Sequence, residues 1–263
     1  MAPEPHAAAS EVITDADRPP PPRRRGGVML VLIVAGLAVG GLGAAAVVGD
    51  GPTQTPAAQT GAVADPSPTL MPPEEAAAAI ASVQRREEGD PFALGRVDAP
   101  VVMVEFSDWR CPFCARFARD TKPELQRFVD DGTLRIEYRD LPVGGEESMR
   151  AARAGRAAGA QGRFWEYYAA LFAAAPEGER PDTTLPALRD YADAAGIPDL
   201  ARFETDLRDV SLDAQIERDI EDARRLGAPS SVPLFLIGDE GLSGAQPTEV
   251  FVEIIERQAQ KVS

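Results

Sequence analysis

The sequence predicts an α/β sandwich with a block of helices inserted in its middle. Three short runs rich in β-branched and aromatic residues, at 101–106, 134–139 and 234–238, are typical of buried strands. Residues 146–226, between the second and third runs, have a helical pattern almost throughout. The order of strand, helix, strand, helices, strand, turn and helix is that of an α/β fold with a helical insertion.

Two further helices complete the predicted domain. A helix should follow the first strand, with Phe117 and Phe128 among its apolar positions. After a turn bounded by glycines, Pro247 is expected to open the last helix, since proline is tolerated at a helix start. The inner face of that helix is predicted to carry Val250, Phe251, Ile254 and Ile255.

Composition excludes two classes of protein. The 263-residue chain has a formal net charge of −15, whereas a nucleic-acid-binding protein carries a basic surface. The single histidine, His6, lies in a Pro/Ala-rich stretch, so no imidazole is available beside a serine or cysteine nucleophile. Ser-His-Asp and Cys-His hydrolases are therefore excluded, while 44% hydrophobic residues can still supply a core.

The N-terminal region is predicted to anchor the domain to a membrane. Residues 1–25 are polar and rich in proline and alanine, which indicates a disordered cytoplasmic tail. Residues 26–49 are uncharged and would form a helix about 36 Å long, enough to span a bilayer core of about 30 Å. Arg23, Arg24 and Arg25 precede this run, so the positive-inside rule places the rest of the chain outside the cytoplasm.

The apolar run has two alternative explanations. A cleaved signal peptide with the alanines at 44–46 as its cleavage site would export the domain equally, but residues 26–49 exceed the apolar core of a usual signal. A soluble core helix would be unusual without a polar face. We therefore expect an uncleaved anchor, a flexible Pro/Ala-rich linker over 50–73 and one globular domain over 74–263.

Both cysteines of the chain, Cys111 and Cys114, lie three positions apart directly after the first predicted strand. A zinc site needs about four ligands, and the chain has neither a second CxxC pair nor a usable histidine. A structural disulfide is allowed outside the cytoplasm, but a loop this short contributes only about 2 kcal/mol in the chain-entropy model. A redox pair needs two thiols close enough to exchange at a helix start, which is the predicted arrangement.

The local geometry predicts different roles for the two thiols. Pro112 suits the first helical position, which makes Cys111 the expected N-cap. A Cys111 thiolate would accept hydrogen bonds from the N–H groups of Phe113 or Cys114 and face the positive end of the helix dipole, which lowers its pKa. Cys114, one turn further along, is the expected buried resolving thiol. Arg110 either adds positive charge beside Cys111 or is a solvated surface residue.

Three segments together resemble a known family: "VEFSDWRCPFC" after a strand, "QGRFWEYYAALF" in the helical insertion and "SVPLFLIG" at the late strand. With them, the region from about Asp90 to Gln258 is similar to the DsbA-like members of the thioredoxin superfamily. The resemblance implies a thioredoxin-like fold with an inserted all-helical subdomain, here preceded by the single N-terminal transmembrane helix. It also implies thiol-disulfide oxidoreductase activity at a redox-active CxxC centre, with no bound cofactor.

The resemblance implies roles for individual residues. Cys111 corresponds to the exposed nucleophile of the family and Cys114 to its partner. Val232 and Pro233 match the loop whose cis-proline faces the disulfide and pairs with substrate backbone. The alternatives are an ordinary trans proline that opens the strand and a match at Pro229 instead, although Pro233 directly precedes the strand.

Glu105, six residues before Cys111, matches the buried acid of the family. Buried in an apolar sheet, Glu105 would have a raised pKa and would relay the proton of Cys114. The alternative is a glutamate at a strand edge that faces solvent, since charged residues are rarely buried completely.

Substrate contacts are expected from Val232, Trp109 and Phe113. Trp109 and the aromatic residues of "FWEYY" are assigned to the core or to the lining of a groove rather than to chemistry. Phe113 also marks a departure, because the strongly oxidising relatives carry histidine between the cysteines. Without that imidazole the Cys111 thiolate loses a stabilising partner, so a less oxidising couple is expected.

These features predict an exported, membrane-tethered oxidoreductase that oxidises cysteine thiols of secreted proteins. Its expected electron acceptor is a quinone-linked membrane partner resembling DsbB or vitamin K epoxide reductase. A second hypothesis is a reductase of haem-attachment or other exported cysteines. A third is a tethered binding or sensor module in which the CxxC only stabilises the fold. Pro233 and Glu105 favour the enzymes, because a binding module needs neither.

Overall fold

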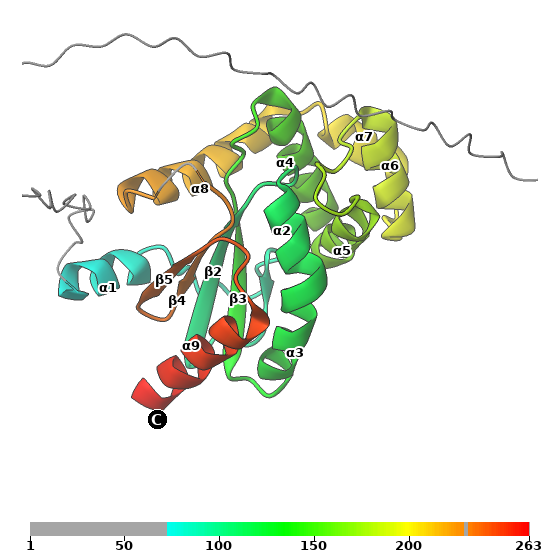
Figure 1. Ribbon diagram of the computed structural model, residues 1–263. Coiled ribbons are helices and arrows are strands. Elements are labelled where there is room, and N and C mark those ends of the chain that lie inside the picture. The colour runs from blue at the N-terminus through cyan, green and yellow to red at the C-terminus, as the bar shows by residue number, and fades with distance from the viewer. Residues whose placement is uncertain (1–72, 229–230, 263) are drawn as a thin grey trace, which may run out of the picture. The chain divides into compact units, whose positions relative to one another are not determined.

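The computed structural model describes residues 73–228 and 231–262 (Figure 1). The predicted cytoplasmic tail, transmembrane helix and nearly all of the linker lie outside the described residues, as does Pro229. Within the described ranges, no helix is long and apolar enough to cross a bilayer. Pro73, the last residue of the predicted linker, is instead the first residue of a helix.

Helices and strands follow one another in the predicted order. The strands are β1 (Ala93–Leu94), β2 (Val101–Ser107), β3 (Leu134–Asp140), β4 (Leu234–Ile237) and β5 (Glu240–Ser243). The helices are α1 (Pro73–Ala81), α2 (Pro112–Arg116), η2 (Phe117–Thr121), α3 (Lys122–Asp130), α4 (Glu146–Gly159), α5 (Phe164–Ala174), α6 (Leu185–Ala194), α7 (Leu200–Asp206), η3 (Val210–Leu212), α8 (Asp213–Arg225) and α9 (Thr248–Lys261).

The strands form one sheet in the order β1-β3-β2-β4-β5. β2 and β3 run parallel, and the other neighbouring pairs are antiparallel. The three predicted strands are confirmed as β2, β3 and β4, which are buried over their full length. The sequence does not predict β1 or β5, because β1 has only two residues and β5 is a partly exposed stretch without an apolar run.

Helices cover both faces of the sheet, which explains why its central strands are apolar throughout. Met103 of β2 belongs to a buried cluster with residues of α3 and α9, whereas Val104 belongs to a cluster with residues of α1 and α8. Because side chains alternate along a strand, Glu105 and Ser107 lie on the same face of β2 as Met103.

The helical insertion, α4 to α8, builds a second core around Trp109. In Figure 1, α4 to α7 gather on one side of the sheet, next to α2 and α3. The Trp109 ring stacks on Phe172 with ring centroids 5.6 Å apart and an interplanar angle of 5°. Gly155 lies against the same indole, where a Cβ atom would collide with it. The insertion is therefore packed on the residues that lead from β2 to the cysteines.

The helix that follows β2 is not continuous. A π-helical turn, Phe117–Thr121, separates α2 from α3. Pro123, in the first turn of α3, has no N–H to donate, which removes one helical hydrogen bond and accounts for the break. Phe117 and Phe128 are buried as predicted, but on separate segments rather than on one helix.

The last helix, α9, begins at Thr248, so Pro247 is its N-cap rather than its first residue. Its inner face is largely as predicted. Phe251, Ile254 and Ile255 are buried, and the helix closes over the same face of the sheet as α3.

A buried ion-pair network joins the helical insertion to the sheet. Arg156 of α4 donates to the carboxylate of Asp140 over 2.7 Å and pairs with Asp219 of α8. Asp219 also accepts a hydrogen bond from the Asp140 N–H over 2.9 Å and pairs with Arg85 over 2.6 Å. Arg156, Asp140 and Asp219 are all buried, so each charge depends on its partners for solvation.

Replacing Arg156 with methionine is expected to lower the free energy of unfolding by about 3–5 kcal/mol, because two carboxylates stay buried without their shared cation. Urea unfolding of the full chain measures the change. Arg189→Met is the control, since Arg189 pairs with Glu204 at the surface and should contribute less than about 1 kcal/mol. Equal losses in the two variants would contradict a stabilising role for the buried network.

Candidate active site

The cysteines lie where the sheet meets α2. Cys111 has an extended backbone and is the N-cap of α2, with Pro112 as the first helical residue. The Ala115 N–H donates to the Cys111 carbonyl over 3.0 Å, which closes the first turn. The predicted N-cap position of Cys111 is confirmed.

Cys111 is the accessible thiol of the pair. Its side chain is partly exposed, and its sulfur is not in a disulfide. The Cys114 thiol and the N–H groups of Cys114 and Phe113 lower the pKa of Cys111 to about 7, although burial and the nearby Asp108 carboxylate raise it. A large fraction of Cys111 is therefore thiolate at neutral pH, and the thiolate is the nucleophile in disulfide exchange.

Cys114 is completely buried, with 0% exposure, in the core that the helical insertion forms. Burial and the neighbouring Cys111 hold the pKa of Cys114 well above its usual value. Cys114 is therefore a protonated thiol at neutral pH, enclosed in the core and out of reach of a substrate. In the described part of the chain, no cluster of His, Cys, Asp and Glu side chains is suited to hold a metal ion.

The loop before β4 faces Cys111. The peptide bond between Val232 and Pro233 is cis, as predicted, so the trans alternative is wrong. The Cys111 thiol donates to the Val232 carbonyl over 3.4 Å. The fold thus brings the cis-proline loop and the N-cap cysteine into contact, although they are 121 positions apart in the chain.

Glu105 is buried near the cysteines rather than exposed at a strand edge, and its exposed fraction is 0%. The Tyr168 hydroxyl donates to Glu105 Oε1 over 2.9 Å, whereas Oε2 has no hydrogen-bond partner among the described residues. Burial raises the pKa of Glu105 to about 7, although Lys122, Tyr168 and Ser107 each lower it. A carboxyl that titrates near neutral pH can give or take a proton when the thiols react.

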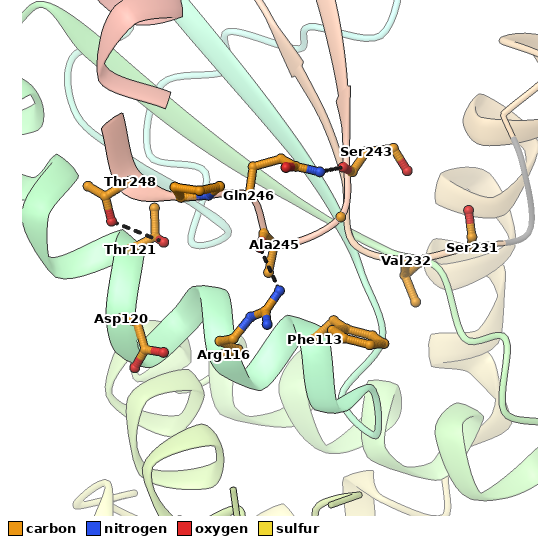
Figure 2. Close-up of a pocket in the computed structure, with 12 residues that line it drawn as sticks. Phe113, Arg116, Asp120, Thr121, Ser231, Val232, Ser243, Ala245, Gln246 and Thr248 are labelled. Atoms are coloured by element: carbon orange, nitrogen blue, oxygen red, sulfur yellow. Dashed lines mark hydrogen bonds between the residues drawn. The ribbon is translucent and has the colours of Figure 1, made fainter. Parts of the chain in front are cut away.

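A groove of about 650 Å³ opens between α2, the loop before β4 and the loop after β5. Figure 2 shows Phe113 and Arg116 on the α2 side, facing Val232 and Ala245. Arg116 donates to the Ala245 carbonyl over 2.7 Å and so joins the two sides of the groove. A second hollow of about 630 Å³ shares Phe113 and Arg116 and extends toward the end of α5.

Of the three predicted substrate contacts, Phe113 and Val232 line the groove. Phe113 is 56% exposed, so an incoming chain can reach its ring. Trp109 is 1% exposed, and its Nε1 donates to Asp140 over 2.8 Å inside the helical core. No protein substrate can contact Trp109 there, so its assignment to substrate binding is wrong and its alternative assignment to the core is correct.

Arg110 is not a free positive charge beside Cys111. Its guanidinium pairs with Glu147 of α4 and is largely covered, so neither of the two predicted roles describes it fully.

From the sequence, Asp108 has no expected role, and Tyr168, as part of "FWEYY", is expected only in the core or in the lining of a groove. Asp108 is 2% exposed, and its carboxylate accepts hydrogen bonds from the N–H groups of Val143, over 2.8 Å, and Gly144, over 3.1 Å. It therefore fixes the chain between β2 and Cys111 against the loop that follows β3. Aspartate is a common turn residue, so its place just after a strand could have indicated from the sequence that Asp108 fixes a turn.

Known proteins are similar to this chain over most of the described residues. A sequence model of the family described as "Thioredoxin" matches residues 87–257. "Disulfide bond formation protein D" of Bacillus subtilis is 26% identical over 174 residues, which cover 65% of this chain and 78% of that protein. The crystal structure of oxidised BdbD from Bacillus subtilis matches with a TM-score of 0.60 and 26% identity, over 64% of this chain and 92% of that one.

A relative of a different kind also matches part of the chain. The "Na(+)/H(+) antiporter NhaA 1" of Mycolicibacterium vanbaalenii is 35% identical over 148 residues. These residues cover 55% of this chain but only 23% of the antiporter, so the similarity concerns one part of a much longer protein.

Proposed function

The chain belongs to the thioredoxin family, and on this premise we propose that it forms disulfides in exported proteins through Cys111 and Cys114. Its relatives confirm the resemblance to DsbA-like proteins predicted from the sequence, and the chain is a thiol-disulfide oxidoreductase. The oxidising direction, the tether and the partners are our proposals.

The asymmetry of the two thiols is the observation that carries the proposal. Cys111 is partly exposed with a pKa lowered to about 7, whereas Cys114 is buried with a raised pKa. A stabilised thiolate at Cys111 favours the reduced form of the pair, which makes the disulfide form a better oxidant.

The proposed reaction transfers two electrons from the substrate to the pair. A substrate thiolate attacks the Cys111 sulfur of the disulfide, and Cys114 leaves as a thiolate that takes a proton from Glu105. A second substrate thiolate then attacks the mixed disulfide, forms the substrate disulfide and releases Cys111 as a thiolate. Phe113, Val232 and Pro233 would hold the substrate segment beside Cys111 during both steps.

Reoxidation needs an electron acceptor outside this chain. By family resemblance we assign it to a quinone-linked membrane protein similar to DsbB or vitamin K epoxide reductase. The apolar run at 26–49 supports a tether that keeps the domain next to such a membrane partner, with residues 50–72 as the linker.

The redox potential tests the direction of electron flow. The full chain is equilibrated with mixtures of reduced and oxidised glutathione, and the fraction of thiol is measured at each ratio. A potential of about −180 mV or higher is expected for an oxidase, whereas a value near that of thioredoxin, about −270 mV, would instead support the reductase.

Replacing Phe113 with histidine is expected to make the pair more oxidising by about 30 mV or more, because an imidazole there can donate to the Cys111 thiolate. The same glutathione titration measures the shift. Phe113→Leu is the matched control, since it also removes the phenyl ring that contacts Arg116 but adds no hydrogen-bond donor. An unchanged potential in the histidine variant would mean that the helix N-terminus already sets the stability of the thiolate.

A further inference from the structure

Ser107 is a second buried polar residue on the face of β2 that carries Glu105. It lies two residues after Glu105, is 0% exposed and points to the same side of the sheet. The Ser107 Oγ has no hydrogen-bond partner among the described residues, and neither has Glu105 Oε2. A buried hydroxyl without a partner destabilises the fold, so its presence beside the cysteines needs an explanation.

The Ser107 side chain lies within reach of both Glu105 and Cys114. The nearby hydroxyl lowers the pKa of each of these groups, although neither contact is a formed hydrogen bond in this structure. Its position is fixed by the strand, since the Ser107 carbonyl accepts a hydrogen bond from the Leu141 N–H over 2.9 Å. The hydroxyl is therefore free to turn toward either neighbour while the backbone stays in place.

Other titratable groups surround Glu105 but are oriented differently. Tyr138 neighbours it on β3, and Tyr168 of α5 already donates to its Oε1. The Lys122 ammonium, from the start of α3, lies over the Trp165 ring, 4.4 Å from the centroid. None of these groups donates to Oε2 in the described structure.

We propose that the Ser107 hydroxyl passes the proton between Glu105 Oε2 and the Cys114 sulfur. This role rests on the proposed function of Glu105 and adds the atom that connects it to the thiol. When a substrate thiolate attacks Cys111 and expels Cys114, the Ser107 O–H gives its proton to the Cys114 sulfur. The neutral Glu105 carboxyl then gives its proton to the Ser107 oxygen. Cys114 ends as a thiol, Ser107 is restored and Glu105 becomes a carboxylate.

Two variants of nearly equal volume test the role of this hydroxyl. Ser107→Thr keeps the hydroxyl and Ser107→Val removes it, so their packing differs little. We expect dithiothreitol to reduce the disulfide of the full-length Ser107→Val chain about tenfold more slowly than the wild type between pH 6 and 7. Ser107→Thr is expected to stay within about twofold of the wild type, because it retains the proton carrier.

A double variant separates a shared proton path from a structural role. If Ser107 and Glu105 act in series, the loss in the double variant should be no larger than the larger of the two single losses. Ser148→Ala is the control, because Ser148 of α4 is also completely buried with an unpartnered Oγ, yet lies outside β2. Its rate of reduction is expected to equal that of the wild type.

The outcomes distinguish this inference from the proposed function. Equal rates in Ser107→Thr and Ser107→Val, with Glu105→Gln slow, would overturn the role of Ser107 and leave that of Glu105 intact. Fully additive losses in the double variant would also overturn it. If Glu105→Gln reacts like the wild type, both roles are wrong. Should Ser107→Val not fold, Ser107→Ala replaces it with the same expected loss.

Discussion

Replacing Cys114 with serine is expected to strand the mixed disulfide between Cys111 and a substrate. Exchange passes through this intermediate, and the second cysteine normally resolves it. Cys111 is partly exposed and keeps the two backbone N–H groups that lower its pKa, and the serine hydroxyl can donate in place of the Cys114 thiol, so Cys111 remains a competent nucleophile in the variant. On a non-reducing gel of cells that express the full chain, Cys114→Ser should accumulate complexes with cysteine-containing proteins that a reducing agent dissolves.

Cys111→Ser is the matched control for the trapping experiment. It leaves Cys114 as the remaining thiol, which is 0% exposed and has a raised pKa, so we expect few or no complexes. Intact-mass measurement after incubation with oxidised glutathione gives the same comparison in purified protein. Equal trapping by both variants would contradict the division of roles. If neither forms complexes and the full chain cannot reduce insulin or oxidise a reduced protein, the binding module becomes the better hypothesis.

The sequence predicts the parts of the site that depend on local patterns. The apolar run of β2, the proline after Cys111 and the proline before β4 are local signals, and each leads to the structure observed. The face that Glu105 occupies also follows from the alternation of side chains along β2. The same alternation places Ser107 beside Glu105, although the sequence gives no reason to consider a serine there.

The sequence cannot predict contacts that depend on how the helical insertion packs. Tyr168 reaches Glu105 from α5, 63 positions further along the chain, and no local pattern indicates that bond. Trp109 follows β2 closely enough to suggest a substrate contact, yet α4 and α5 enclose its ring. The π-helical turn before Lys122 is a further example. Pro123 removes one helical hydrogen bond, but where the helix breaks also depends on how α2 and α3 pack.

Replacing Glu105 with glutamine is expected to slow the reduction of the disulfide about tenfold to a hundredfold, because the leaving Cys114 thiolate loses its proton donor. Stopped-flow reduction by dithiothreitol between pH 5 and 9 measures the rate. Since the pKa of Glu105 is about 7, the loss should be large below that pH and shrink above it, where Glu105 is ionised in the wild type. Equal rates across this range would remove Glu105 from the mechanism.

The same variant is expected to be more stable than the wild type at alkaline pH, although its disulfide is reduced more slowly than that of the wild type below about pH 7. Burial raises the pKa of Glu105 from 4.5 to about 7, so the folded state binds the proton more tightly than the unfolded state. The stability that this proton provides is fully present below about pH 4.5 and is lost as the pH rises through about 7. The loss amounts to about 3 kcal/mol, and glutamine avoids it because it never ionises.

Urea unfolding of the reduced full chain at pH 5 and pH 8 measures how the free energy of unfolding changes with pH. The Glu105→Gln chain should gain stability relative to the wild type between the two pH values, by up to about 3 kcal/mol. Glu137→Gln is the matched control. Glu137 of β3 is as deeply buried as Glu105 but lies on the opposite face of the sheet, where it pairs with Arg135 and Arg139. Its loss of ion pairs should destabilise the chain at pH 8 without changing the pH profile of exchange. A Glu105→Gln chain that is less stable than the wild type at pH 8 would mean that the carboxylate is held by its surroundings and does not titrate near neutral pH.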